Sequence, residues 1–449
     1  MDQLITIKDA LIVPLILLVA WMIGNRITKR HIIEEPYYKY FKWGLFAKMF
    51  AGLAFSAVYL FYYDGGDTTT YFFGTESIVR MAGKDFPTFI KLLIGYNTDE
   101  VFSMFDYTTK YPEYWSDVNS FAVCRFNVPF YLLGFGSFLG NTLAMNLILY
   151  AGVWRFYKLM VLLFENKAKS LAIVLLFIPS VLFWGSGILK DGWCLTATFF
   201  IFISMYHIFI AKKKIFLNII ALVFWGYISI SIRPYSFYTT LGSGLIWIGF
   251  YYIFVFKNKF LRTVVFPVVI VGLWLVGTSM FTKLSVFAGN RYNSMEAMLE
   301  TAWIIQDDLK KEYYGGNSFD IGAFEPTFAG ILGKAPEAIM AGIFRPYLWE
   351  SKTLFMAISG LETLFLLVFF IYMFLKFRVI LFFSKVFSHP FLIASFVFSI
   401  TYSFFVGLTT ANFGALVRYR MPVFVFLLLI LVVIYQQKKN KEGALNPQN

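Results

Sequence analysis

The sequence predicts an all-α polytopic integral membrane protein with about eleven transmembrane helices and two long extracytoplasmic loops that carry interfacial helices. Of the 449 residues, 59% are apolar and only 14% are charged, and the mean hydropathy is +0.67. This composition excludes an ordinary soluble globular chain. Apolar runs long enough to cross a hydrocarbon core of about 30 Å recur from one end of the chain to the other. We therefore expect one membrane domain over residues 1–449.

The apolar runs set the positions of the expected spans, to within a few residues at each boundary. The first run, Ala10 to Gly24, is short and follows Lys8 and Asp9, so its loss would move only the N-terminus. A cleavable signal peptide is not expected, because Asp2 and Asp9 stand where a basic region would be needed. The expected spans are 9–24, 44–63, 141–163, 171–188, 192–211, 215–232, 236–256, 263–282, 353–375, 390–409 and 421–436.

Clusters of cations lie between alternate spans and predict the topology. Cytoplasmic loops are enriched in Lys and Arg, so these clusters mark the cytoplasmic side and place the N-terminus outside and the tail 437–449 inside. They also account for most of the net charge of +13 without forming one basic face, and no nucleic-acid partner is expected. The clusters are Arg26, Lys29, Arg30, Lys39 and Lys42; Lys167 and Lys169; Lys212 to Lys214; Lys257, Lys259 and Arg262; Lys376, Arg378 and Lys385; and Lys438, Lys439 and Lys441.

Two segments, 64–140 and 283–352, are too long and too polar to be turns, and both fall on the outer side. Loops of this length usually carry function. In the first, the partly apolar stretch Phe126 to Leu139 predicts a helix at or dipping into the outer interface. In the second, helical spacing of apolar residues predicts a helix from Asn293 to Tyr314, ended by Gly315-Gly316.

A pair of aspartates stands where the second span emerges outside, in the run Tyr63-Asp64-Gly65-Gly66-Asp67-Thr68-Thr69-Thr70-Tyr71. The two glycines permit a tight exit from the membrane, which turns both carboxylates toward one point. An aspartate at a membrane rim is suited to act as a general base toward a hydroxyl. Turn chemistry is the alternative, with Asp67 capping a helix that starts at Thr68.

Cations occur on the outer side, where the topological rule depletes them. Arginine binds phosphate through bidentate, charge-assisted hydrogen bonds, so a set of outer arginines favours a phosphate or pyrophosphate on a lipid. The alternative is that they snorkel to headgroups or pair with local acids such as Asp191 and Glu350. The outer cations are Arg125, Lys190, Arg233, Arg291, Arg345, Arg418 and Arg420.

One acidic residue, Glu362, lies within an otherwise apolar span and is a functional candidate for that reason. The histidines do not offer a base at the outer side, because His31 and His207 lie on or near the cytoplasmic side and His389 comes just before a span. An aspartate is therefore the expected base.

Three motifs resemble the polyprenyl-phosphate-sugar-dependent glycosyltransferases of the GT-C superfamily. Gly65 to Tyr71 looks like the aspartate-plus-tyrosine motif of that family's first outer loop. Ile178-Pro179-Ser180 followed by Lys190-Asp191 resembles its proline-ended span and polar outer turn. Arg418-Tyr419-Arg420-Met421-Pro422 is similar to its Arg-Tyr-x-x-Pro element. The order matches across most of the chain, whereas the span at 9–24 is extra, and Lys190-Asp191 replaces a usual acidic or arginine residue.

The resemblance implies an inverting transfer from a polyprenyl-phosphate-linked sugar to a glycan, lipid or protein acceptor, in the inner (plasma) membrane of a bacterium. Asp67 would be the base, with Asp64 as a helper or metal ligand, and whether a divalent metal takes part stays open. The expected substrate-binding residues are Tyr71, Arg125, Lys190, Asp191, Arg233, Arg345, Glu362, Arg418 and Arg420.

Two other functions stay open. Bacterial O-antigen and exopolysaccharide polymerases share apolar spans, outer arginines and similar aspartate-tyrosine elements. A transporter or flippase for anionic lipid-linked glycans would use the arginines to bind cargo, but it should carry polar residues near the membrane midplane, whereas the polar residues singled out here gather at the outer face.

Overall fold

The computed structural model describes residues 4–255, 297, 300, 303–304, 307–308, 318–322, 325 and 327–445. Within these residues the secondary structure is helical, apart from an isolated bridge between Ser318 and Asn412. Eight described helices are long and apolar enough to cross a membrane, and the count is nine if the bent pair α20 and α21 is one span. The prediction of an all-α polytopic membrane protein is confirmed at this level.

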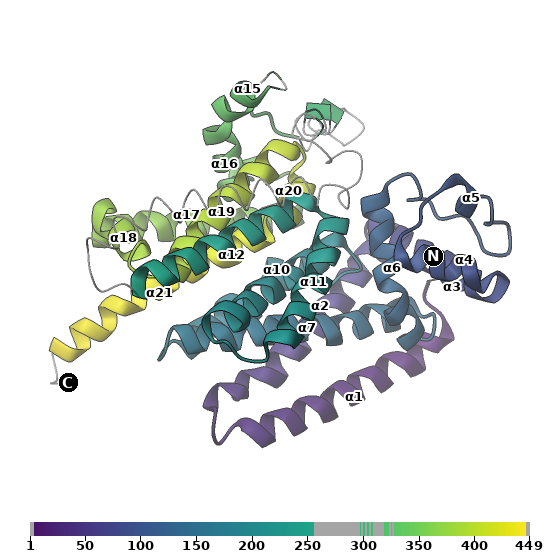
Figure 1. Cartoon of the computed structure of the whole chain (residues 1–449), viewed down its shortest axis with the longest axis horizontal. Coiled ribbons are helices and arrows are strands. Elements are labelled where there is room, and N and C mark those ends of the chain that lie inside the picture. The colour runs from purple at the N-terminus through teal and green to yellow at the C-terminus, as the bar shows by residue number, and fades with distance from the viewer. Residues whose placement is uncertain are drawn as a thin grey trace. The chain divides into compact units, whose positions relative to one another are not determined.

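The candidate spans follow the expected order along the chain (Figure 1). They are α1 (Ile7–His31), α2 (Phe41–Phe61) after η1 (Pro36–Tyr40), α7 (Phe138–Leu163), α10 (Lys190–Met205) continuing into η2 (Tyr206–Ile210), α11 (Ile215–Ile232), α12 (Pro234–Val255), α17 (Leu354–Phe377), α19 (Pro390–Thr409), and α20 (Phe413–Tyr419) with α21 (Met421–Leu445).

The first span is longer than expected, because α1 covers 25 residues. The span expected at 263–282 lies outside the described residues, and so does most of the helix expected at 293–314. Neither prediction is tested.

The expected span at 171–188 is not one helix. The chain forms α8 (Ala168–Leu176) and α9 (Pro179–Trp184) instead, followed by the buried irregular segment 185–189. Proline disfavours helical geometry in the residue before it. Ile178 accordingly has an extended backbone (φ −70°, ψ 122°), and Pro179 starts α9 at a position that requires no N–H donor.

The first long loop is mostly helical, and the helix expected at 126–139 was misplaced. Its helices are α3 (Asp67–Lys84), α4 (Phe86–Ile94), α5 (Asp99–Phe102) and α6 (Val118–Leu133). Most of α6 is buried within the protein, including Phe121, Asn127 and Val128, and its position relative to the membrane interface stays a prediction. The described end of the second loop forms α15 (Phe328–Gly333), α16 (Ala335–Phe344) and η6 (Leu348–Glu350).

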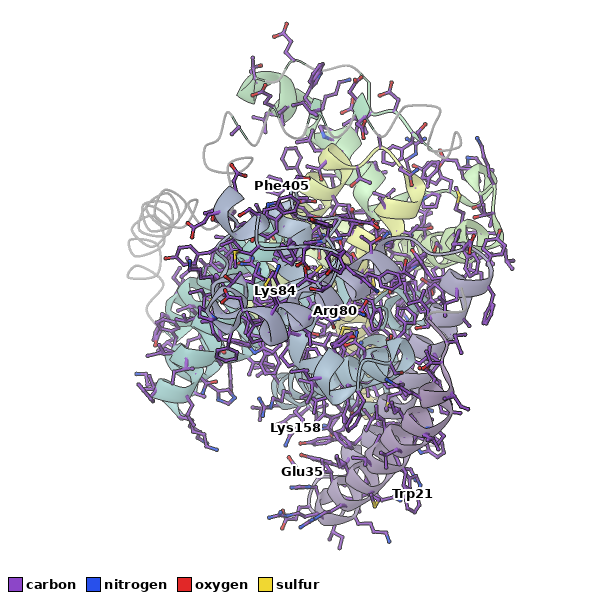
Figure 2. All side chains as sticks on the ribbon, turned by 90° about the vertical axis from the view of Figure 1, so that its right-hand side faces the viewer. Trp21, Glu35, Arg80, Lys84, Lys158 and Phe405 are labelled. Carbon is purple, nitrogen blue, oxygen red and sulfur yellow. The ribbon has the colours of Figure 1, made fainter. Side chains whose placement is uncertain are left out.

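The chain divides into two compact units. Unit 1 comprises Met1–Leu159, Leu175–Phe199 and Tyr227–Arg233. In it α3 packs against α4 and α6 (Figure 1), and α2 packs against α1 and α9. Lys158 of α7 pairs with Glu35, with 3.2 Å between Nζ and Oε2, and the two side chains lie close together in Figure 2.

Unit 2 comprises Met160–Val174, Phe200–Gly226 and Pro234–Asn449. In it α19 packs against α12, α16 and α21, and α18 (Val379–Val386) follows α17. Small residues permit the close approach of α16 and α19, since a Cβ added at Gly342 or Gly407 would collide with the backbone of the other helix.

Candidate functional site

The aspartate motif forms the corner between α2 and α3. Asp64, Gly65 and Gly66 all have positive φ (56°, 117° and 120°), a geometry that glycine adopts without strain. Gly66 is the N-cap of α3, and Asp67 is its first residue. The expected alternative, in which Asp67 caps a helix starting at Thr68, is therefore wrong by one residue, and the carboxylate of Asp67 makes a tertiary contact.

That contact is with a later part of the same loop. The Tyr114 hydroxyl donates a hydrogen bond to Asp67 Oδ1 (2.8 Å), and the rings of Tyr71 and Tyr114 have centroids 4.9 Å apart. Thr70 donates to Glu113 over 3.4 Å. The segment around Tyr114 therefore covers the start of α3 and orients the candidate base.

Asp117 connects this loop to α10. Its carboxylate caps α6 by accepting hydrogen bonds from the N–H groups of Asn119 and Ser120 (3.1 and 3.2 Å). It also lies 3.7 Å from Nζ of Lys190, the first residue of α10. Asn119 reaches the end of α11 by donating to the Ser231 carbonyl oxygen (2.8 Å).

A buried ion pair fixes the other side of the site. Arg233 Nη1 lies 2.7 Å from Asp191 Oδ1, and the two side chains are 6% and 0% exposed. Lys190 interacts electrostatically with Asp117, Arg233 and Asp67. We call Asp67, Tyr114, Asp117, Lys190, Asp191 and Arg233 the aspartate–lysine cluster. It is built from the α2–α3 corner, the loop before α6, the start of α10 and the end of α11.

Arg125 lies apart from the carboxylates of the cluster. It is on α6, 5% exposed, with its guanidinium against Gly95 at the end of α4. Burial lowers the pKa of Arg125, and nearby Tyr227 opposes that shift. Its Nε atom is buried without a hydrogen-bond partner in the part of the chain that the structure describes.

The expected arginines of the C-terminal half belong to unit 2. Arg345 forms hydrogen bonds with Glu350 (Nε to Oε1, 3.1 Å), and its guanidinium stacks over Phe319 and Phe413 at 4.8 and 5.6 Å from the ring centroids. The expectation that an outer arginine pairs with Glu350 is met here. The side chain of Arg345 thus joins the segment around Phe319 to the start of α20 at Phe413.

Arg420 lies at the break between α20 and α21, whose axes differ by 54°. Its Nη1 donates to the carbonyl oxygen of Arg345, the residue that ends α16, and Glu362 attracts it electrostatically. The guanidinium of Arg418 lies 5.9 Å from the Tyr419 ring centroid. Arg420 is therefore a cationic neighbour of Glu362.

The structure brings Asp67, Tyr71, Lys190, Asp191 and Arg233 together within unit 1, with Asp64 beside them at the same corner. Sequence reasoning missed Tyr114 and Asp117. The signal available for Asp117 was its N-cap position three residues before Ser120, at the start of an apolar run. Tyr114 had no such signal, since it lies among several aromatic residues of the same loop.

No group of three or more His, Cys, Asp or Glu side chains is placed to hold a metal ion in the described part of the chain. The fold and the buried polar cluster define this chain as a polytopic α-helical membrane protein. No family model, no curated protein and no solved structure matches it.

Proposed function

We propose that this protein is an inverting glycosyltransferase that moves a sugar from a polyprenyl-phosphate carrier to an acceptor hydroxyl. The observation that carries the proposal is the position of Asp67, whose carboxylate is held by Tyr114 in the same cluster as Lys190 and Arg233. A candidate general base, a cation and an orienting hydroxyl then belong to one cluster, as nucleophilic displacement by a hydroxyl requires.

In the proposed reaction, Asp67 takes the proton of the acceptor hydroxyl as its oxygen attacks the anomeric carbon. The bond from that carbon to the phosphate oxygen breaks, and the polyprenyl phosphate leaves with the electron pair. Lys190 is suited to the developing negative charge, because its 3.7 Å contact with Asp117 is longer than an ordinary charge-assisted hydrogen bond. Arg233 is held by Asp191 and keeps the start of α10 in place.

The other residues that the sequence predicts to bind substrate are proposed to do so in the same glycosyl transfer. Substrate binding is proposed for Tyr71 and Arg125, which belong to unit 1, and separately for the unit 2 residues Arg345, Glu362, Arg418 and Arg420. The proposal also includes the bacterial inner membrane and an extracytoplasmic site, with the N-terminus outside and the C-terminus in the cytoplasm.

The test is Asp67→Asn, which keeps the size of the side chain and removes the base. We expect glycan transfer from a polyprenyl-phosphate sugar to fall by about 100-fold or more, with unchanged amounts of folded protein in the membrane. Asp99→Asn is the matched control, because Asp99 lies in the same loop at the start of α5. Wild-type turnover by Asp67→Asn would assign Asp67 to the corner between α2 and α3 alone.

A transporter of anionic lipid-linked glycans is the second candidate. It is favoured by polar side chains that lie at membrane depth beside a broken helix, namely Lys48, Asn146 and Ser186. Movement of a labelled carrier-linked glycan across vesicles without any new glycosidic bond would identify the transporter. Chains of repeating units made from pyrophosphate-linked donors would identify a polymerase.

A further inference from the structure

Lys48 is a buried cation inside the apolar length of α2. It is 5% exposed, and no carboxylate pairs with it in the described parts of the chain. From Lys48 to the end of α2 at Phe61 the distance along the helix is about 20 Å at 1.5 Å per residue. A charge at such depth is costly and is retained for a reason.

The Lys48 Nζ group binds the backbone just after the end of α9 at Trp184. Nζ donates to the carbonyl oxygen of Gly185 (2.7 Å) and lies 3.4 Å from Ser186 Oγ. Asn146 of α7 donates to the carbonyl oxygen of Ser186 (2.7 Å). Irregular backbone at membrane depth requires such donors, since lipid supplies none. Lys48 and Asn146 together satisfy the first two carbonyl groups of the segment 185–189.

Glycines bring this segment against α2. A Cβ at Gly52 would lie 2.5 Å from Asn146 Nδ2 and 3.1 Å from the Ser186 oxygen, and a Cβ at Gly187 would overlap the ring of Phe55. The segment is thus held closely along α2, and any side chain added at either glycine would push it away.

The segment leads directly into Lys190 and Asp191. These residues begin α10 and enter the aspartate–lysine cluster, where Lys190 meets Asp117 and Asp191 meets Arg233. A shift of the segment therefore moves both residues relative to Asp67. Lys48 and the cluster are joined by the irregular segment 185–189, whose helical hydrogen bonding ends with the Gly185 N–H to the Val181 carbonyl oxygen (3.0 Å) and the Ser186 N–H to the Phe183 carbonyl oxygen (3.3 Å).

We propose that Lys48 is a positioning residue, which pins the segment 185–189 so that Lys190 and Asp191 reach the reacting groups at a fixed position. This inference rests on the proposed glycosyl transfer for its catalytic consequence. The contacts of Lys48 with Gly185 and Ser186, which we call the lock, do not depend on the reaction and can be measured separately.

The first experiment measures the lock. Lys48→Met, Lys48→Arg and the control Lys42→Met are reconstituted in lipid nanodiscs, and amide hydrogen exchange is followed in peptides covering 185–191. Lys42 is a lysine of the same helix whose Nζ binds Asn25 (3.0 Å) and not this segment. We expect exchange to rise about tenfold or more in Lys48→Met alone and to return toward wild type in Lys48→Arg. Unchanged exchange in Lys48→Met overturns the proposal.

The second experiment measures the consequence. In a transfer assay, Lys48→Met should lower kcat by about tenfold or more with little change in KM, because small misplacements of catalytic groups act on the chemical step. Recovery in Lys48→Arg separates positioning from loss of fold, and an unchanged kcat in Lys48→Met contradicts it. If the wild type transfers no sugar, the proposed function fails and hydrogen exchange still decides the lock. If Lys48→Met does not accumulate, Asn146→Leu replaces it, with the same rise in exchange expected.

Discussion

Arg233 and Asp191 form a buried ion pair, in which each charge compensates the other. Removing one partner from such a pair leaves an uncompensated charge, which typically costs about 3–5 kcal/mol, whereas replacing both by apolar residues is often nearly neutral. Arg345 is also paired with an acidic residue, Glu350. Two of the arginines expected on the outer side, Arg233 and Arg345, therefore already form ion pairs within the protein.

We therefore predict that Asp191→Asn strongly lowers the thermal stability of the purified protein, while Asp191→Leu combined with Arg233→Met recovers most of the loss. Melting in detergent, followed by intrinsic fluorescence, gives both values. Glu113→Gln, at a carboxylate whose described contact is a 3.4 Å hydrogen bond from Thr70, is the control and should melt near the wild type. Additive losses in the double variant would show that the two residues do not act as a pair.

His389 makes stability depend on pH. Burial lowers its pKa to about 4, and its Nδ1 accepts a hydrogen bond from the N–H of Phe391 (3.2 Å), so the folded protein holds the ring neutral. In the unfolded chain the pKa is about 6.5. As pH falls below about 6.5, the unfolded state gains a proton that the folded state does not take. The free energy of unfolding then decreases until the pH reaches about 4.

We expect the wild type to lose up to about 3 kcal/mol of stability from this group between pH 7 and pH 4. His389→Asn keeps a side-chain acceptor at the N-cap of α19 and does not titrate, so its melting temperature should fall less over the same range. Parallel pH profiles for the two proteins would contradict the assignment.

At the scale of elements, α4 has the features of the interfacial helix that the sequence predicts for the first long loop. Phe86, Ile90 and Ile94 recur every four residues and are 60%, 41% and 61% exposed, so they form one apolar face. The Tyr227 hydroxyl donates to the Ile94 carbonyl oxygen (3.5 Å). Tyr227 is about 7 Å along the helix axis from the end of α11, and we therefore expect α4 to lie near the membrane surface.

A nitroxide label on Ile90→Cys should therefore show high accessibility to oxygen and low accessibility to a water-soluble nickel complex. The same label on Tyr107→Cys, which is 89% exposed in the same loop, is the control and should show the reverse. Background labelling of α6 is small, because burial raises the pKa of the Cys124 thiol to about 12. Equal nickel accessibility at both positions would remove α4 from the interface.

At the scale of the whole molecule, the predicted site residues divide between two compact units. Asp64, Asp67, Tyr71 and the first three cations belong to unit 1, while Arg345, Glu362, Arg418 and Arg420 belong to unit 2. The chain passes between the units several times, so neither is a continuous stretch of sequence. A reading of local motifs does not detect such a division, because it depends on which distant helices pack together.

The sequence by itself determined the membrane class and eight of the eleven expected spans, or nine if the bent pair α20 and α21 is one span, because a hydrocarbon core demands apolar runs of a set length whatever their packing. It also indicated Asp67, Lys190 and Arg233, since charges at the ends of apolar runs stand out locally. Only the tertiary structure decided that Tyr114 holds Asp67, that Asp191 neutralises Arg233, and that Lys48 binds the broken segment at Gly185. Arg233 and Asp191 are 42 positions apart in the sequence (233 − 191), and Lys48 and Gly185 are 137 positions apart (185 − 48). A local sequence pattern does not predict contacts between residues so far apart.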